Sequence, residues 1–241
     1  MKKKLCVFAL IVLTAIFAVS TYFLLTQNIE DKKQMNDFEE IQDIIDDNSN
    51  DIYSLGIYSD LYKQNSDFMA WIKIEGTNIN YPVMRSKNNP NYYLNHNFNK
   101  EYSRFGVPYM QEDCDMQSDN IVIYGHNMQN KSMFNELTNY KSKHFYERHQ
   151  IIIIDTVLEH REYEVISVFK TVAYESNSFE YYNFVNASTE EDYRAYIEKC
   201  KALSLYDTGI DAKYGDKLIT LSTCEYSQDN GRFVVVAKLV D

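Results

Sequence analysis

The pattern of apolar and polar residues divides the chain into an apolar N-terminal run, a polar stretch and a long region of short strands. Residues 5–25 carry no charge and are long enough to cross a bilayer as one helix. The acidic residues 26–50 predict a stem helix with one apolar stripe, formed by Phe38, Ile41, Ile44 and Ile45. A second amphipathic helix is predicted from Ile52, Tyr53, Leu55, Tyr58, Leu61 and Tyr62.

The charges that flank the apolar run predict its orientation. Three lysines at positions 2–4 precede it and a mixed acidic and basic stretch follows, so residues 1–4 are expected on the cytoplasmic side. The alternative is a cleaved signal peptide with a weak small-residue site at 18–20. Because the run continues to Leu25, beyond a typical signal core, an uncleaved anchor is favoured. Under either interpretation, the rest of the chain is expected to be exported.

From Trp71 onward the apolar period shortens and short strands alternate with turns. The pattern predicts strands at 71–74, 79–84, 106–110, 121–124, 151–156 and 161–173, the last two as a hairpin. Residues 121–124 are continuously apolar, so this strand is expected to be central and buried. A short helix is predicted over 134–140. A longer one begins at the capping-box sequence 188–191, and its apolar face includes Cys200.

The C-terminal stretch 217–239 predicts a hairpin of two apolar strands around a polar connection. Cys224 closes the first strand and Arg232 opens the second. In an antiparallel hairpin these positions are neighbours, so a thiol and a guanidinium are expected side by side at one rim of the sheet. About eight short strands with few helices predict a mostly antiparallel barrel, closed so that no long edge is left free.

Composition narrows the class of protein. The chain has 241 residues, enough for one sizeable domain plus an appendage. Its net charge of −11, with no offsetting basic patch, argues against nucleic acid as a partner. The acidity suits a soluble domain held away from an anionic membrane surface.

The four cysteines follow no zinc or redox spacing, and no histidine pair has ligand spacing, so neither a metal nor another cofactor is expected. Cys6 lies in the apolar run, which leaves an odd number of cysteines in the rest of the chain. At least one of these thiols is therefore free unless it forms a disulfide with another chain. Cys200, on an apolar helix face, is assigned to structure. Cys114 is too, because its acidic loop is expected to raise its thiol pKa.

Cys224 remains as a candidate nucleophile. A cysteine in an apolar strand is usually a buried hydrophobe, but this one ends its strand where a polar loop begins. His126 has the equivalent position, directly after the buried strand 121–124 and a glycine. Arg232 beside the thiol favours the thiolate and can hold an oxyanion. The alternative for Arg232 is a surface ion pair with Glu225 or Asp229.

Together, the segments Tyr124-Gly125-His126-Asn127-Met128, Thr220-Leu221-Ser222-Thr223-Cys224 and Asn230-Gly231-Arg232-Phe233 resemble the sortases of Gram-positive bacteria. The resemblance spans residues 70–240 and includes the N-terminal anchor. The helix predicted before the cysteine strand and the helical N-terminal extension resemble class B.

The resemblance implies an eight-stranded sortase barrel over residues 67–241, with N-terminal helices in an extracellular stem (26–66) and a transmembrane anchor at 5–25. It implies a transpeptidase, related to thiol proteases, on the outer face of the cell membrane. Such an enzyme cleaves a sorting-signal peptide of exported proteins and joins the new carboxyl to an amine of peptidoglycan.

Carried over residue by residue, the resemblance makes Cys224 the nucleophile, His126 the acid and base, and Arg232 the oxyanion or substrate clamp. Substrate-binding positions are also implied. Ser222 and Thr223 line the substrate, Glu225 offers its backbone N–H, and class B substrate loops are matched by Leu94, Tyr181 and Tyr182.

Two alternatives stay open at this point. A cysteine endopeptidase would use the same three residues and release its acyl group to water. A catalytically silent, anchored module would use the barrel only to display a peptide groove.

Overall fold

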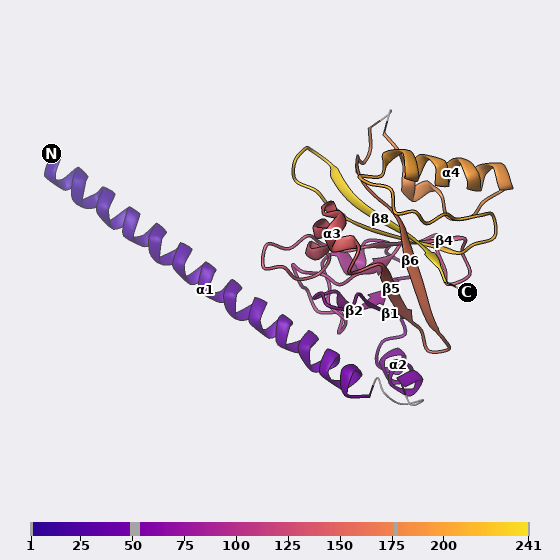
Figure 1. Ribbon diagram of the computed structural model, residues 1–241. Coiled ribbons are helices and arrows are strands. Elements are labelled where there is room, and N and C mark those ends of the chain that lie inside the picture. Colours follow the sequence, from indigo (N-terminus) through magenta and orange to yellow (C-terminus); the bar gives the residue numbers. More distant parts are fainter. Residues whose placement is uncertain (1, 49–53, 176–177, 241) are drawn as a thin grey trace. The chain divides into compact units, whose positions relative to one another are not determined.

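The computed structural model describes residues 2–48, 54–175 and 178–240, and the chain divides into two units, residues 1–47 and 48–241. The first unit contains one helix, α1 (Lys2–Asn48), which runs without a break through the predicted anchor and through residues 26–48 of the predicted stem (Figure 1). Within the described residues, α1 is the one helix long and apolar enough to cross a membrane. Ile52 and Tyr53, predicted to begin the second helix, lie outside the described residues.

The second unit contains the predicted eight-stranded barrel, which is closed in the order β1-β2-β3-β4-β7-β8-β6-β5. Its strands are β1 (Phe68–Lys73), β2 (Asn80–Met84), β3 (Tyr109–Met110), β4 (Asn120–Tyr124), β5 (Ile151–Asp155), β6 (His160–Val172), β7 (Leu218–Cys224) and β8 (Gly231–Leu239). The strand predicted at 106–110 is shorter than expected. Gly106 has a positive φ of 56°, and Pro108 has no N–H for a ladder, so pairing begins only at Tyr109.

Most neighbouring strands are antiparallel, as predicted, but β2–β3 and β4–β7 pair in parallel. The prediction of a central, buried strand at 121–124 is confirmed: β4 lies between β3 and β7, and Ile121, Val122 and Ile123 are buried. A strand covered on both faces tolerates this continuous apolar run.

The barrel unit also contains helices and short 3-10 segments, which precede or connect the strands: α2 (Ser54–Gln64), η1 (Tyr92–Leu94), η2 (Asn135–Lys141), α3 (Lys143–Tyr146), η3 (Tyr181–Asn183) and α4 (Glu190–Leu203). α2 belongs to the barrel unit, because the Tyr58 ring stacks on Phe68 and its hydroxyl donates to Asp155 at 2.9 Å. It was predicted as one of the N-terminal helices within residues 26–66.

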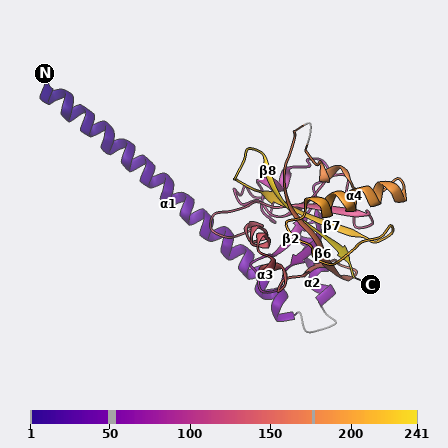
Figure 2. The same cartoon turned by 45° about the horizontal axis from the view of Figure 1, so that its top comes forward.

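The helix inserted before the cysteine strand is confirmed as α4 (Figures 1 and 2). Its N-cap is Thr189, inside the predicted capping-box sequence, whose hydroxyl accepts the Asp192 N–H at 3.1 Å. The Ser167 hydroxyl on β6 donates to the Cys200 carbonyl at 2.7 Å, which ties the helix to the barrel.

Candidate active site

Three predicted residues reach one edge of the barrel because of how β4, β7 and β8 pair. β4 and β7 are parallel with Tyr124 opposite Ser222, so both strands end at the same edge. His126 follows Tyr124 at the same interval as Cys224 follows Ser222. On the other side of β7, the antiparallel register sets Cys224 directly opposite Arg232. Residues distant in the sequence are therefore brought to the ends of three adjacent strands.

All three side chains line one cavity of about 550 Å³. The Cys224 thiol is partly exposed and free. Among the predicted substrate-binding residues, four also line this cavity: Leu94, Tyr182, Ser222 and Thr223. Tyr181 and Glu225 do not belong to its wall.

Hydrogen bonds fix the loop that carries His126 to the end of β7. The Gly125 N–H donates to the Ser222 carbonyl at 3.1 Å, and the Thr223 hydroxyl donates to the Gly125 carbonyl at 2.7 Å. Beyond the histidine, the Asn127 side-chain amide donates to the Cys224 carbonyl at 2.8 Å. Thr223 therefore has a positioning contact beside its place in the cavity wall.

Position 125 requires glycine for a steric reason. A Cβ there would lie 2.6 Å from the ring of Phe134, which is fully buried. The close approach of this ring to the backbone explains why the predicted strand end contains a glycine before the histidine.

The His126 ring is oriented by the backbone of a residue predicted to bind substrate. Its Nε2 lies 2.8 Å from the Leu94 carbonyl oxygen. A carbonyl only accepts, so Nε2 carries a proton and Nδ1 is the nitrogen available for proton transfer. Leu94 therefore lines the cavity, and its carbonyl oxygen also selects the tautomer of the His126 imidazole.

The ion pair considered for Arg232 is not formed. Within the described residues its guanidinium has no carboxylate partner; Nη1 donates to the Gly231 carbonyl at 3.0 Å, and the Tyr174 ring centroid lies 5.9 Å from Cζ. The alternative of a surface ion pair is therefore not supported, and Glu225 pairs instead with Lys141 and Lys170.

Glu225 is a buried structural carboxylate. It pairs with Lys170 at 3.0 Å and Lys141 at 3.3 Å, and it accepts the Ser227 N–H at 3.0 Å. Burial would raise the pKa of Glu225, but these hydrogen bonds outweigh it and lower the pKa to about 2. Its own N–H, predicted to face the substrate, donates to the Gly231 carbonyl at 2.9 Å. That N–H is engaged in the hairpin, so we assign it no oxyanion role.

A hydrogen bond between the buried residues Tyr181 and Ser222 supports the cavity wall. Their hydroxyls share a hydrogen bond of 2.6 Å, and both residues are buried. Burial raises the pKa of Tyr181, with the hydrogen bond to Ser222 opposing it, so the phenol stays neutral. Tyr182, the next residue, reaches the cavity.

The wall residues that the sequence prediction missed include Tyr109, Gln111 and Tyr124. Gln111 joins the two sides of the cavity, because its amide accepts from the Tyr124 hydroxyl and donates to the Tyr182 carbonyl at 2.8 Å. Burial raises the pKa of Tyr109 to about 12. Tyr109 and Gln111 lie at or beside an ordinary strand end, and no sequence motif marks them. Tyr124 stands in one of the segments that resemble the sortases, but no role was assigned to it.

The remaining cysteines of the barrel unit match their structural assignment. Cys114 and Cys200 are buried free thiols. Burial is the main cause that raises the pKa of Cys114 to about 11, and the neighbouring Asp113 adds to it. Burial likewise raises the pKa of Cys200 to about 12. Both thiols are protonated and unreactive at neutral pH.

Comparison with known proteins identifies the family. The sortase-domain family model matches residues 72–240. Sortase B of Staphylococcus aureus (strain NCTC 8325 / PS 47) is 30% identical over 244 residues, which cover 99% of this chain and 98% of that protein. A crystal structure of sortase B complexed with triglycine superposes with a TM-score of 0.79 at 31% identity, covering 88% of this chain and 99% of that one.

A Staphylococcus aureus sortase B–substrate complex superposes with a TM-score of 0.77 at 30% identity, covering 88% of this chain and 99% of that one. The family match extends over most of the barrel unit, and the closed barrel agrees with the solved sortase B structures. The chain therefore belongs to the sortase family of cysteine transpeptidases, and its relatives here are sortases B.

Proposed function

We propose that this chain cleaves a C-terminal sorting signal of exported proteins through a thioester and transfers the new carboxyl to a peptidoglycan amine. One observation carries the proposal: a thiol, an imidazole and a guanidinium line the same cavity at adjoining strand ends. Family membership supports the class of reaction.

In the first half of the reaction, the Cys224 thiolate attacks the scissile carbonyl carbon and a C–S bond forms. The carbonyl π electrons move to oxygen, and the oxyanion is met by the N–H donors of Arg232. Arginine suits this role because its planar fork stays charged at every relevant pH. Loss of a single oxyanion donor typically costs about 2.7–4 kcal/mol of transition-state stabilisation.

His126 then moves the protons. Protonated Nδ1 gives its proton to the leaving amine as the C–N bond breaks, which leaves the thioester on Cys224. The acceptor amine attacks the thioester and returns a proton to Nδ1. The C–S bond breaks and the thiolate is restored. The hydrogen bond from Nε2 to the Leu94 carbonyl supports this choice of nitrogen.

The proposed substrates follow from the cavity and from the relatives. Its volume of about 550 Å³ and its tyrosine-rich wall suit an extended peptide. One related structure is described as a sortase B–substrate complex, and another as sortase B complexed with triglycine. By analogy, we propose a sorting peptide as the acyl donor and an amino-terminal peptide amine of the cell wall as the acceptor.

We also propose that α1 anchors the enzyme in the cell membrane with residues 1–4 inside and the barrel on the extracellular face. The apolar residues 5–25 and the lysines that precede them support this orientation. Labelling Lys4→Cys or Tyr214→Cys, each in a Cys224→Ala background, with an impermeant reagent on intact cells tests it. Only position 214 should react; reaction at position 4 alone would reverse the orientation.

The reaction is tested by incubating the detergent-solubilised chain with a library of sorting peptides, with and without a triglycine acceptor. The expected result is cleavage with a triglycine-linked product and a Cys224 acyl adduct detected by mass spectrometry. Product that ignores the acceptor identifies an endopeptidase instead. The absence of both cleavage and adduct, with peptide binding retained, identifies a silent binding module.

A further inference from the structure

Among the residues that the structure describes, Arg232 has no carboxylate partner, which is what normally orients a guanidinium. A carboxylate would hold the side chain but would also neutralise its charge and occupy its N–H groups. Within the described residues, one protein hydrogen bond is made, to the Gly231 carbonyl. The question is therefore what keeps this flexible side chain in the cavity.

The aromatic ring of Tyr174 meets the guanidinium instead. Its centroid lies 5.9 Å from Arg232 Cζ, within the range of a cation–π contact. The same ring packs against Tyr182 at 6.2 Å, and all three residues line the cavity. Tyr174 thus connects the guanidinium to the wall formed by η3.

The backbone of Tyr174 is held in an unfavourable conformation. Its φ is +66°, a region that a bulky residue rarely adopts, and 76% of its surface is exposed. The preceding residue is fixed, because the Ala173 N–H donates to the Asn230 carbonyl at 3.0 Å. On β6, Thr171 lies directly opposite Arg232 in the ladder. The strained turn therefore brings an exposed ring back over the start of β8 rather than into the core.

We infer that Tyr174 is a positioning residue that holds the Arg232 guanidinium through its ring, in place of a carboxylate. This inference rests on the proposed function for its catalytic meaning. A ring attracts the cation without cancelling its charge and uses none of its N–H donors. The donors stay available for the oxyanion that forms at the neighbouring Cys224.

The test compares two alkylating reagents, anionic iodoacetate and neutral iodoacetamide, on the full chain. The rate of modification is measured on the peptide that contains Cys224, because Cys6 is also exposed. A well-placed Arg232 charge raises the iodoacetate rate relative to the iodoacetamide rate. Arg232→Gln should lower this ratio about fivefold, the effect of one unit charge at ~4 Å in water.

Tyr174→Leu should lower the ratio nearly as far as Arg232→Gln, because leucine has no π face. Tyr174→Phe keeps the ring and should stay close to wild type. Tyr214→Leu is the matched control, since Tyr214 is also exposed but does not line this cavity. A wild-type ratio in Tyr174→Leu, or in Arg232→Gln, overturns the inference.

Peptide cleavage supplies a second readout. Tyr174→Leu should reduce kcat/KM about fivefold in the presence of Arg232 and less than about twofold in the Arg232→Gln background. Equal reductions in both backgrounds would mean that Tyr174 acts independently of the arginine and would overturn the inference. If the wild-type chain cleaves no sorting peptide, the proposed function fails, whereas the alkylation ratio still decides the role of Tyr174.

Discussion

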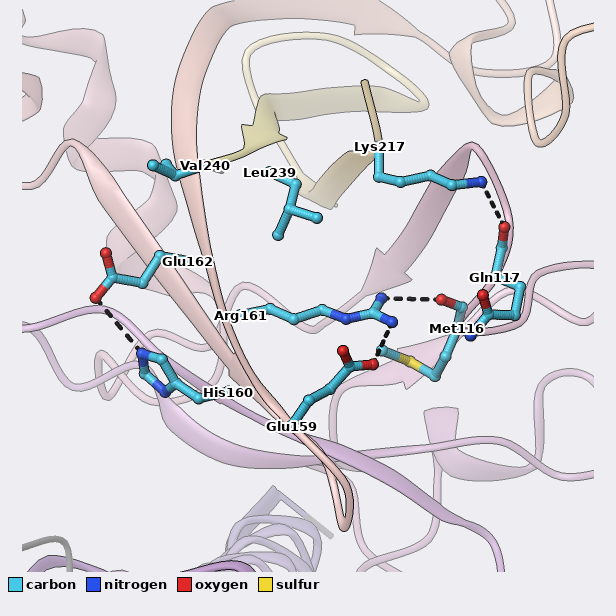
Figure 3. A pocket seen from close by; sticks show the side chains of 9 residues that line it. All are labelled: Met116, Gln117, Glu159, His160, Arg161, Glu162, Lys217, Leu239 and Val240. Carbon is cyan, nitrogen blue, oxygen red and sulfur yellow. Dashed lines mark hydrogen bonds and ion pairs between the residues drawn. The ribbon is translucent and has the colours of Figure 1, made fainter. Parts of the chain in front are cut away.

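At each end of the β7–β8 pair lies a cavity lined by an arginine. The register pairs Cys224 with Arg232 at one end and Leu218 with Lys238 at the other. The cavity at the second end, of about 350 Å³, is lined by Arg161, Lys217 and residues of the β6 and β8 ends (Figure 3). Similar cationic side chains thus occur in two hollows of one barrel.

The two ends differ in how their cations are paired. Arg161 donates to the Met116 carbonyl at 2.9 Å and forms an ion pair with Glu159 (Figure 3). Lys217 donates to the Gln117 carbonyl at 2.7 Å and to Asp119 at 2.8 Å. Both cations therefore hold the loop that leads into β4. Within the described residues the guanidinium of Arg232, by contrast, makes one hydrogen bond, to the Gly231 carbonyl.

The comparison separates a structural arginine from a functional one by its partners rather than by its location. Both arginines line cavities, so a hollow surface alone does not distinguish them. Hydrogen bonds made within the protein contribute to the stability of the fold. Donors that face a cavity without a protein acceptor contribute little to stability and are available to bind a ligand. Substitutions at the two ends should therefore affect different measurements.

The largest expected effect is at the thiol. Cys224→Ala should abolish turnover, because no other side chain in the cavity is a thiol, while the melting temperature changes little. Cys200→Ala is the opposite control: it removes a fully buried sulfur, so stability should fall by about 1–2 kcal/mol with the rate per folded molecule unchanged. Peptide turnover and thermal unfolding measure both. Residual wild-type turnover in Cys224→Ala would refute the assignment of the nucleophile.

The next effect compares the two arginines with the same substitution. Arg232→Lys should lower kcat/KM about 100-fold or more, because lysine does not reproduce the fork that meets an oxyanion. Its melting temperature should stay near wild type.

Arg161→Lys should do the reverse. The shared donation to Met116 and Glu159 is lost, and unfolding free energy should fall by about 1–3 kcal/mol at unchanged kcat/KM. Urea titration and steady-state kinetics separate the outcomes. If Arg232→Lys instead unfolds the barrel, that arginine is structural and the contrast between the ends disappears.

The parts that could be predicted from the sequence are those set by local pattern. Cys224 and Arg232 meet across a hairpin, so their neighbourhood follows from the turn between them. His126 was matched to the thiol only by its strand-end position and by resemblance. The parallel pairing of β4 with β7, which brings it there, joins strands nearly a hundred residues apart in sequence, and neither strand's pattern specifies its neighbour.

The errors of the sequence analysis arose at residues whose partners come from distant parts of the sequence. Glu225 lies near Arg232 in the sequence, yet Lys141 from η2 and Lys170 from β6 reach it first. Tyr174 gave no signal at all, because a positive φ and a ring contact are consequences of the tertiary structure. Local propensity predicted the strands, whereas the contacts between distant segments depend on the tertiary structure.

Glu225 tests whether the catalytic end also contains a purely structural pair. Its pKa, lowered to about 2, means that its contribution to stability is present above the unfolded value of 4.5 and is lost as pH falls toward 2. Glu225→Gln should therefore destabilise the chain near neutral pH by about 1–3 kcal/mol and by much less near pH 2. Chemical unfolding across this range measures it. An equal loss at every pH would mean that packing, not charge, explains the effect.

The smallest expected effect is at the far cavity, where His160 lies 2.6 Å from Asp155 and 3.5 Å from Glu162. Burial lowers the pKa of His160, but the hydrogen bonds to these carboxylates outweigh it and raise the pKa above the ordinary 6.5. The stabilisation is therefore present below pH 6.5 and is lost as pH rises through the raised value. Because the ring is half exposed, the melting temperature should differ between wild type and His160→Gln by only about 1 °C at low pH, and by less above neutrality. Asp155→Asn should remove most of this pH dependence. A difference that grows with pH would show that His160 acts as a neutral ring, and the far end would then owe its stability to Arg161 and Lys217 alone among the cations of that cavity.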